Sequence, residues 1–386
     1  MVSETPVNDK PPKVWILAGE ASGDAYGAAL ARAIHERQPE TTIQGMGASQ
    51  MQEAGVDILV DSTDLGIVGF VEVIKHLPMF LRLFKGLVRQ AEAARPDVVV
   101  LIDYPGFNLR FAKKMHQRGI KVVYFVSPQV WAWGKGRVKE MARIIQHMIV
   151  IFPFEEPFYR ESGLPATFVG HPMVHMMREA SSDPVERDDA LIALMPGSRM
   201  SEVSRLIRPM LETARKLHQE HPQYRFVIPV PNQRLENYIQ NEIKAVWPAA
   251  QALIRIAPKQ ANLVMQQATA GLAASGTVTV QCAIMGLPLV VMYKVNAMTY
   301  AIGKRLINVK YITMVNIVAD DLVFEEFIQD DAEPEKVLPA LESILPGGSR
   351  RQDVLTGMDR SVNALQSDGK PTDLAADIIL KEASAS

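Results

Sequence analysis

The sequence predicts an α/β protein with two mostly parallel sheets, each covered by helices. Three observations carry this prediction: short apolar runs alternate with amphipathic segments, the runs are rich in β-branched residues, and the alternation restarts near residues 188–191. The run Asp97–Asp103 (DVVVLID) is typical of a strand that is buried on both faces. The restart indicates two doubly wound, Rossmann-like domains of comparable size that face one another across a cleft.

Both halves are expected to follow the same order of strands and helices. In the first half a strand at 14–18 leads into a helix at 24–37, and further strands are expected at 97–103, 121–126, 148–152 and 167–169. In the second half a strand at 191–195 leads into a helix at 201–221, and further strands are expected at 225–230, 253–256, 270–274 and 289–293. The expected parts are a flexible tail at 1–12, an N-terminal domain at 13–180, a C-terminal domain at 181–345 and a helical tail at 346–386.

Composition excludes several classes of protein. The 386 residues include 41 Lys and Arg against 43 Asp and Glu, so no nucleic-acid partner is expected. One cysteine, Cys282, can form neither an internal disulfide nor a Cys-rich zinc site, which fits a reducing, cytoplasmic compartment. Residues 1–12 lack the apolar region of a signal peptide. The uncharged run 260–293 contains Asn, Gln and Pro, so we expect buried helix, strand, helix and strand there instead of a membrane span.

The first strand leads into a turn that carries two carboxylates, Gly19-Glu20-Ala21-Ser22-Gly23-Asp24. This turn matches neither a dinucleotide-binding pattern nor a P-loop. Its glycines allow close backbone approach, and a helix N-terminus can hold an anion. Asp24 or Ser22 could simply cap the helix. The pair Glu20 and Asp24 favours a polar ligand such as sugar hydroxyls.

Two further features follow strands of the first half. Asp103 ends the run 97–103, at the edge of a sheet where ligands bind, and it could act as a general base or cap the turn that follows. The segment Ser127–Arg137 contains Trp131 and Trp133 beside glycines and basic residues. It could pack a sugar ring and meet a phosphate, or it could be an ordinary packed loop.

The second half has two turns suited to anions. Gly197-Ser198-Arg199 and Ser275-Gly276-Thr277 each connect a strand to a helix, and two such turns suit a diphosphate better than a monophosphate. Glu202 could compensate the charge of the first helix start. His171 and His175 lie four residues apart but lack the HExxH pattern, so no metal site is expected.

Residues 65–90 combine an apolar run with an amphipathic stripe, and residues 66–90 contain one acid against four bases. Two interpretations stay open: the segment contacts an anionic membrane or an acyl chain, or it is an ordinary helix packed on the sheet. In the first case the contacting side chains are Ile67, Val68, Phe70, Phe80, Leu83, Phe84 and Leu87.

Several motifs occur in order along the chain: GEASGD at 19–24, GxVGxxEV at 66–73, IDYPGFN at 102–108, VSPQVWAW at 126–133, PFE at 153–155, VGHP at 169–172, LMPGSR at 194–199 and ASGT at 274–277. Over residues 14–345 the chain resembles the lipid-A-disaccharide synthase family. The resemblance implies a GT-B fold with the active site between the domains. It also implies inverting, metal-independent transfer of 2,3-diacylglucosamine from UDP to 2,3-diacylglucosamine 1-phosphate, which forms the β-1,6 lipid A disaccharide 1-phosphate and UDP.

The resemblance further implies how the enzyme is placed and which residues serve it. It implies no cofactor, a peripheral position at the inner face of the cytoplasmic membrane of a Gram-negative cell, and a possible homodimer. Asp103 matches the proposed base for the acceptor 6-hydroxyl, and Glu20, Ser22 and Asp24 match the first motif beside the cleft. On the donor side the matching positions are Gly197, Ser198, Arg199, Ser275, Gly276, Thr277, Gln281 and Asn316.

The chain departs from the family pattern at two donor-side positions. Gln281 replaces the usual Glu, and residues 315–320 (VNIVAD) replace the usual Pro-Asn before Leu-Leu-Ala-Gly. The alternatives are another GT-B enzyme, such as a UDP-sugar 2-epimerase, and a non-catalytic protein that binds a nucleotide sugar or a lipid.

Overall fold

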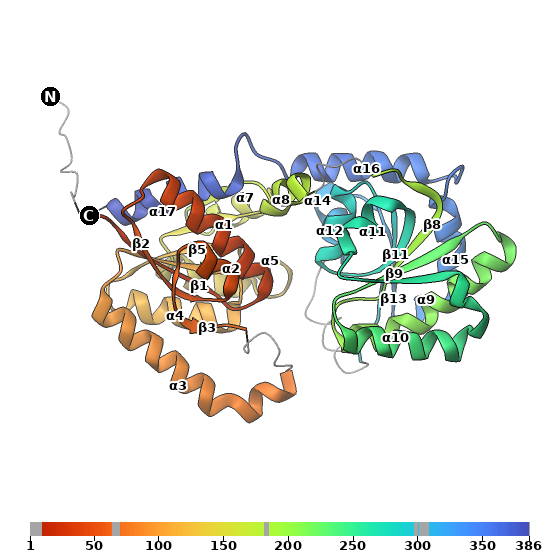
Figure 1. Ribbon diagram of the computed structural model, residues 1–386. Coiled ribbons are helices and arrows are strands. Elements are labelled where there is room, and N and C mark those ends of the chain that lie inside the picture. Colours follow the sequence, from red (N-terminus) through yellow and green to blue (C-terminus); the bar gives the residue numbers. More distant parts are fainter. Residues whose placement is uncertain (1–9, 64–69, 181–184, 297–299, 301–308, 386) are drawn as a thin grey trace. The chain divides into compact units, whose positions relative to one another are not determined.

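The chain divides into two compact units. The computed structural model describes residues 10–63, 70–180, 185–296, 300 and 309–385 (Figure 1). Unit 1 comprises residues 1–172 and 367–386, and unit 2 comprises residues 173–366. Each unit is built around one parallel sheet, as the alternating pattern predicts.

Unit 1 holds a seven-stranded sheet in the order β3-β2-β1-β4-β5-β6-β7, with parallel pairing throughout. The strand order reverses between β1 and β4, which is the point where ligands bind in doubly wound sheets. The strands are β1 (Lys13–Ala18), β2 (Thr42–Gly47), β3 (Asp57–Asp61), β4 (Val98–Ile102), β5 (Lys121–Phe125), β6 (His147–Val150) and β7 (Ala166–Phe168).

Helices cover both faces of this sheet. They are α1 (Ala21–Arg37), α2 (Ser49–Glu53), α3 (Phe70–Ala94), α4 (Pro105–His116), α5 (Val130–Trp133), η1 (Lys135–Arg137), α6 (Val138–Ile144), α7 (Glu155–Arg160) and α17 (Pro371–Ser384). Side chains alternate across a strand, so Val99 and Leu101 of β4 join the core formed with α3, α4 and α6. The other residues of β4 face α1 and α17. Every residue of β4 is therefore buried.

Unit 2 holds a six-stranded parallel sheet in the order β10-β9-β8-β11-β12-β13. Its strands are β8 (Asp188–Met195), β9 (Arg225–Val230), β10 (Ile254–Pro258), β11 (Ala268–Ala274), β12 (Leu289–Tyr293) and β13 (Glu325–Ile328). Its helices are α8 (Pro172–Ala180), α9 (Met200–Glu220), α10 (Gln233–Val246), η2 (Pro248–Ala252), α11 (Ala261–Gln267), α12 (Thr277–Ile284), α14 (Met314–Ala319), η3 (Gln329–Asp331), α15 (Pro334–Ile344) and α16 (Arg351–Ala364).

The uncharged run 260–293 folds as predicted into helix, strand, helix and strand. These elements are α11, β11, α12 and β12, and β11 is buried at every position. Across the described residues, no helix combines the length and the apolar character needed to cross a membrane.

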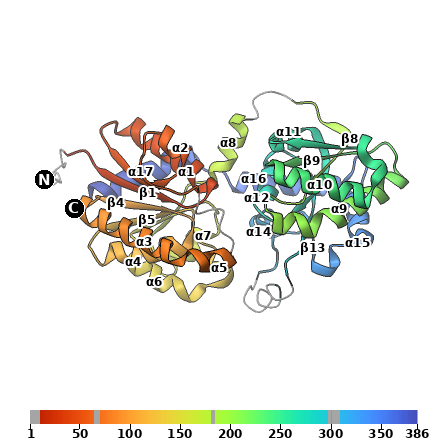
Figure 2. The same ribbon diagram turned by 60° about the horizontal axis from the view of Figure 1, so that its bottom comes forward.

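The division of the chain differs from the predicted bounds on both sides of unit 2. The boundary was expected after residue 180, but all of α8 beyond Pro172 belongs to unit 2. The expected helical tail also splits, because α16 stays with unit 2 while α17 lies beside α1 in unit 1 (Figure 2). Arg37 of α1 forms ion pairs with Asp373 (3.6 Å) and Asp377 of α17. The pattern of a terminal helix shows which of its faces is apolar, but it does not show which sheet that face covers.

Candidate active site

Asp103 lies directly after β4, at the carboxyl edge of the unit 1 sheet. Its φ of 45° and the φ of 47° at Tyr104 fall in the left-handed region, which is unfavourable for residues other than glycine. The backbone is held there by three hydrogen bonds. The Asp103 N–H donates to Phe125 O (3.1 Å), and Tyr124 Oη (2.5 Å) and Asn108 Nδ2 (2.8 Å) donate to Asp103 O. The surrounding elements therefore fix the point from which the carboxyl group projects.

The pKa of the Asp103 carboxyl is raised from 3.8 to about 6. Burial is the main cause, the negative charge of Glu20 adds to it, and the backbone N–H of Tyr104 acts in the opposite direction. Burial, followed by the charge of Asp103, also raises the pKa of Tyr26 and of Tyr124. A carboxylate whose pKa lies nearer to neutrality accepts a proton more readily, so Asp103 has the property that a general base needs.

The turn between β1 and α1 lies beside Asp103, because β1 and β4 are neighbouring parallel strands. A Cβ atom at Gly19 would lie 2.4 Å from Cδ1 of Tyr104. A side chain at position 19 would therefore clash with the Tyr104 ring, and glycine leaves the space that the ring occupies. Glu20 is the N-cap residue of α1, and Ser22 is exposed on its first turn. The structure thus brings together Glu20 and Asp103, as the sequence predicts.

Asp24 does not have the geometry of a reacting group, which corrects the catalytic role predicted for it. Its side chain is 2% exposed, and its carboxylate accepts hydrogen bonds from the backbone N–H groups of Ala48 (2.7 Å), Gln50 (3.1 Å) and Met51 (3.3 Å). These groups are the otherwise unpaired donors at the start of α2. Asp24 therefore supports the capping alternative, although the helix that it caps is α2 and not its own helix α1.

A buried carboxyl group that the sequence reasoning missed follows β6 at the same edge of the sheet. Glu155, the first residue of α7, is 1% exposed. Its Oε1 accepts hydrogen bonds from Ser127 Oγ (2.5 Å) and Trp131 Nε1 (3.1 Å). Burial raises the pKa of Glu155 to about 7, although the hydrogen bonds from Ser127 and Trp131, and weaker ones from the backbone of Phe152 and Ile151, act to lower it. The PFE motif at 153–155 was the available signal, but a Glu at a helix start usually has only a capping or charge-compensating role.

The two tryptophans of the segment 127–137 have different surroundings. Trp131 is partly buried and packs edge-on against Phe154, with ring centres 5.0 Å apart. Trp133 is 42% exposed, and the Arg137 guanidinium lies 4.9 Å from its ring centre. One tryptophan therefore fits the packed-loop alternative, and the other fits a surface that binds a ligand.

In unit 2 the two predicted anion-binding turns follow neighbouring strands. Residues 196–199 follow β8 and residues 275–277 follow β11, and these strands pair in parallel with Met195 beside Ala273. Gly197 has a φ of 118°, which favours glycine. Several predicted donor-side residues are at least partly exposed here: Gly197, Ser198, Arg199, Ser275, Gly276, Thr277 and, in the second turn of α12, Gln281.

Glu202 occupies the backbone donors of the first of these turns. Its Oε2 accepts hydrogen bonds from the N–H groups of Ser198 (3.1 Å) and Arg199 (3.4 Å), and its Oε1 lies 3.5 Å from Arg199 Nη1. This is the charge compensation that the sequence suggests for Glu202. A phosphate oxygen would use the same donors, so an anion at this turn has to compete with the carboxylate of Glu202.

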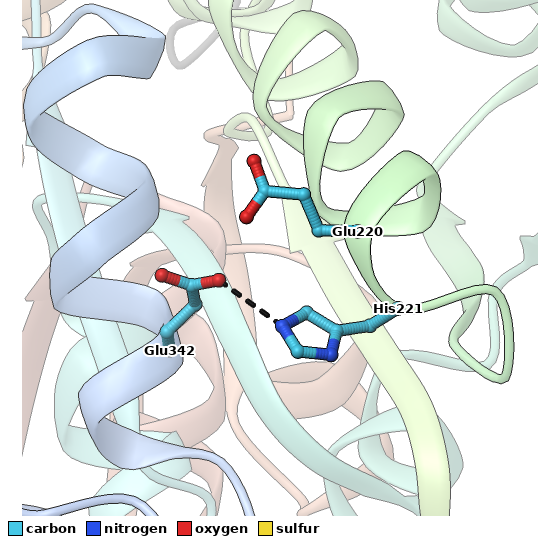
Figure 3. Close-up of side chains that lie close together, drawn as sticks. All are labelled: Glu220, His221 and Glu342. Carbon is cyan, nitrogen blue, oxygen red and sulfur yellow. Dashed lines mark hydrogen bonds and ion pairs between the residues drawn. The ribbon is translucent and has the colours of Figure 1, made fainter.

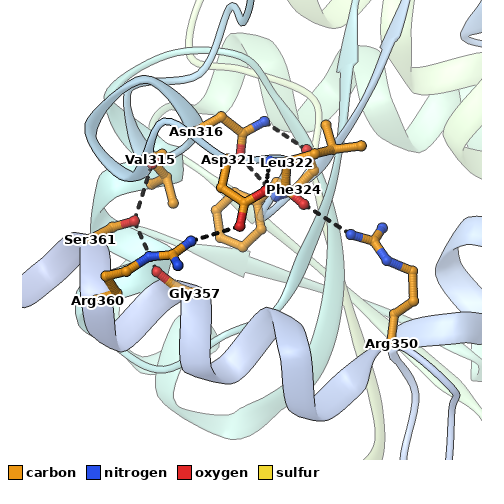
Figure 4. A network of polar contacts seen from close by, with 9 residues as sticks. All are labelled: Val315, Asn316, Asp321, Leu322, Phe324, Arg350, Gly357, Arg360 and Ser361. Atoms are coloured by element: carbon orange, nitrogen blue, oxygen red, sulfur yellow. Dashed lines mark hydrogen bonds and ion pairs between the residues drawn. The ribbon is translucent and has the colours of Figure 1, made fainter.

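Asn316 is buried within unit 2, and both the nitrogen and the oxygen of its side-chain amide have protein partners (Figure 4). Its Nδ2 donates to Phe324 O (2.8 Å) and to Glu326 Oε1 (2.9 Å), and its Oδ1 accepts from the Phe324 N–H (2.8 Å). Glu326 also accepts a hydrogen bond from the N–H of Ile312, whose carbonyl lies 3.4 Å from Ser275 Oγ. Asn316 therefore supports a loop beside Ser275, which corrects the direct contact with UDP that was predicted for it.

The apolar stripe of α3 packs inside unit 1 over its described part. Phe84 meets Phe107 and Phe111 of α4 edge to face, with ring centres 5.3 and 6.0 Å apart, and Leu87 is 1% exposed. Phe80 and Leu83 are partly buried against the same core. These four side chains support the packed-helix alternative and not direct membrane or acyl contact. The predicted residues Ile67 and Val68, and the side chain of Phe70, lie outside the described residues.

A small group of possible metal ligands lies at the other edge of the unit 2 sheet (Figure 3). Glu220, His221 and Glu342 place one ligand atom each within 4.8 Å of one another. The first two end α9, which leads from the carboxyl end of β8 to the start of β9, so they lie away from residues 196–199. His221 Nε2 lies 3.2 Å from Glu342 Oε1, and this partly exposed hydrogen bond accounts for the grouping.

Comparison with known proteins decides the family. A family model described as lipid-A-disaccharide synthetase matches residues 14–376. The chain belongs to the lipid-A-disaccharide synthetase family. The lipid-A-disaccharide synthase of Trichlorobacter lovleyi is 41% identical over 344 residues, covering 87% of this chain and 88% of that protein. The synthase of Myxococcus xanthus is 34% identical over 376 residues, covering 96% and 97%.

Solved structures share the fold of this synthetase family member. The UDP-GlcNAc 2-epimerase from Neisseria meningitidis, solved with UDP-GlcNAc, has a TM-score of 0.61 at 12% identity and covers 96% of this chain and 100% of its own. The kitacinnamycin glycotransferase has a TM-score of 0.63 at 15% identity, covering 97% and 99%. The TM-scores show that the chain has the GT-B type of fold, with two Rossmann-like units. At these low identities the likeness extends to the fold alone, so the epimerase alternative is only a distant structural relation.

Proposed function

We propose that this member of the synthetase family transfers 2,3-diacylglucosamine from its UDP derivative to 2,3-diacylglucosamine 1-phosphate. The products are UDP and the β-1,6-linked disaccharide 1-phosphate. The observation that carries the proposal is Asp103, a largely buried carboxyl with a pKa of about 6 at the carboxyl edge of the unit 1 sheet, beside Glu20. Family membership supports the choice of substrates.

Unit 1 would supply the base. Asp103 accepts the proton of the acceptor 6-hydroxyl while that oxygen attacks C1 of the donor sugar and the bond from C1 to the diphosphate oxygen breaks. Attack from the side opposite to the leaving group inverts the anomeric centre. Glu20 helps by keeping the pKa of Asp103 high, and the hydrogen bonds at Asp103 O keep the carboxyl in place.

Unit 2 would hold the leaving group. Once the Glu202 carboxylate is displaced, the N–H groups of Ser198 and Arg199, together with the exposed Arg199 guanidinium and the turn at 275–277, can neutralise the charge of the departing diphosphate without a metal ion. Gln281 can donate and accept hydrogen bonds, so it can still bind a ribose hydroxyl in place of the usual Glu.

We further propose that the protein works as a peripheral protein at the inner face of the cytoplasmic membrane. Both substrates carry acyl chains, and α3 exposes Arg82, Lys85 and Arg89 on the side opposite to its packed stripe. Basic side chains on one side of a helix attract anionic lipids. The expected homodimer stays a prediction.

The test is to incubate the protein with both substrates and a chelator, and to look for disaccharide and UDP. We expect product, with a rate that falls below about pH 6 as Asp103 becomes protonated. A wild-type protein that forms no disaccharide refutes the proposed reaction. Conversion of UDP-GlcNAc to its 2-epimer would favour the epimerase alternative instead.

A further inference from the structure

We propose that Glu155 is a positioning residue for the acceptor. It anchors the segment Ser127–Arg137, and Trp133 and Arg137 of this segment form the binding surface for the phosphorylated sugar. This inference rests on the proposed function, since it concerns the acceptor of that reaction. It adds a role for a buried residue that the transfer chemistry itself does not use.

The contacts of Glu155 fasten the segment at its start and in its middle. Oε1 accepts hydrogen bonds from the hydroxyl of Ser127 and from the indole N–H of Trp131. Ser127 is the second residue after β5, and Trp131 lies within α5. Tyr159, which follows Glu155 by one helical turn, donates its hydroxyl to Pro128 O (3.0 Å). Hence α7 holds the segment at three residues, Ser127, Pro128 and Trp131.

The anchored segment directly follows a strained backbone position beside Asp103. Val126 has a φ of 62°, which is rare for a β-branched residue and persists only where surrounding contacts enforce it. Its N–H donates to Ile149 O (3.1 Å) of β6, while Phe125 O accepts the N–H of Asp103 (3.1 Å). The segment that Glu155 holds and the proposed base therefore leave neighbouring strands at the same edge.

The second oxygen of Glu155 indicates that packing alone does not explain this residue. Oε2 is buried and has no side-chain hydrogen-bond partner in the described part of the chain. Burying an ionisable carboxyl lowers stability, and apolar side chains could fill the same space without that penalty. What offsets this loss of stability is that one carboxyl oxygen accepts hydrogen bonds from both Ser127 and Trp131, and so fixes the orientation of both side chains.

The end of the segment has the chemistry of a sugar phosphate site. Trp133 offers an exposed aromatic surface, against which the C–H groups of a sugar ring can pack. Arg137 lies over the same ring and exposes a guanidinium whose planar N–H donors fit phosphate oxygens. The acceptor of the proposed reaction carries both a sugar ring and a phosphate, whereas the uridine diphosphate of the donor is assigned to unit 2.

The test compares Glu155→Ala and Glu155→Gln with the wild type by measuring KM for each substrate, kcat and UDP binding by calorimetry. For Glu155→Ala we expect the acceptor KM to rise about tenfold or more, while the donor KM and UDP affinity stay within about twofold. Glu155→Gln keeps an oxygen that can accept both hydrogen bonds, so it should restore most of the acceptor affinity. The matched control is Glu156→Gln, because the neighbouring Glu156 binds the N–H of Phe168 (2.7 Å) and not the segment 127–137.

Each outcome decides the proposal. Unchanged acceptor KM in Glu155→Ala, or an equal rise for donor and acceptor, overturns it, and so does an equal effect of the control. If Glu155→Ala fails to fold, Ser127→Ala and Trp131→Phe take its place, because each removes one donor and should raise the acceptor KM selectively. An inactive wild type would refute the proposed function, whereas an active wild type with insensitive Glu155 variants refutes only this inference.

Discussion

Two substitutions of the same kind in unit 1 are expected to change stability in opposite directions. Asp103→Asn removes a carboxylate that is disfavoured by burial and by the nearby charge of Glu20. Asp24→Asn removes a carboxylate that binds three backbone N–H groups at the start of α2. We expect the first variant to be more stable than the wild type at pH 8 and the second to be less stable.

The magnitude for Asp103 follows from its pKa, which rises from 3.8 to about 6. Each unit corresponds to about 1.4 kcal/mol, so ionised Asp103 lowers the free energy of unfolding by at most about 3 kcal/mol, and partial solvent access reduces this to about 1–2 kcal/mol. The folded protein binds the proton more tightly than the unfolded chain, so wild-type stability falls as the pH rises from 3.8 to about 6. The advantage of Asp103→Asn should therefore appear across this range and stay constant above it.

The assay is urea unfolding at pH 4 and pH 8, followed by tryptophan fluorescence, because Trp15, Trp131 and Trp133 of the four tryptophans belong to unit 1. Asp24→Asn should lose about 1.5–3 kcal/mol, the contribution of hydrogen bonds to a charged group. The same Asp103→Asn protein should lose roughly two to four orders of magnitude in kcat. An Asp103→Asn protein that is less stable than the wild type at pH 8, or whose advantage is equal at both pH values, would refute the reasoning.

Two further predictions concern the donor turn and α3. Glu202→Gln removes the negative charge that competes with a phosphate for the donors at residues 196–199, so UDP should bind roughly three- to tenfold more tightly, as measured by calorimetry. Glu212→Gln on the same helix is the control and should leave UDP binding unchanged. Weaker UDP binding would show that Glu202 assists the donor. Phe84→Ser should lower the free energy of unfolding by about 2–4 kcal/mol without changing liposome binding, whereas Leu81→Ser on the exposed side should change stability by less than about 0.5 kcal/mol. The reverse pattern would restore the membrane-contact interpretation of the stripe.

The central strands of both sheets could be predicted because burial on both faces requires continuous apolar, β-branched runs. β4 (VVVLI) is the clearest example. The strands β2 (TIQGMG), β3 and β13 were not predicted. β2 lacks such a run, and its Gly45 lies so close to β1 that an added Cβ would be 1.8 Å from Ile16 O. The packing that demands this glycine is not visible in the local pattern.

The candidate site divides in the same way. Asp103 and the turns at 196–199 and 275–277 could be predicted because each follows a strand, and strand ends of a parallel sheet share one edge. The actual roles of Asp24, Glu155 and Asn316 depend on partners between 8 and 28 positions away in the chain. No local pattern specifies such partners, so the residue type suggested ligand chemistry for Asp24 and Asn316, where the fold uses capping and support, and it pointed to no role for Glu155.

The position of α17 has a consequence for the order in which the protein folds during synthesis. Residues 173–366 of unit 2 are contiguous, so this unit has all of its elements once α16 has been made. Unit 1 begins to emerge first, and α1 covers part of one face of its sheet, but the rest of that face stays uncovered until residues 371–384 follow. Lys121 of β5 then donates to Glu382 O (2.9 Å). The half that carries the proposed base is therefore the last to be completed, and the part of its sheet that α17 covers stays exposed for the whole time that unit 2 takes to be translated.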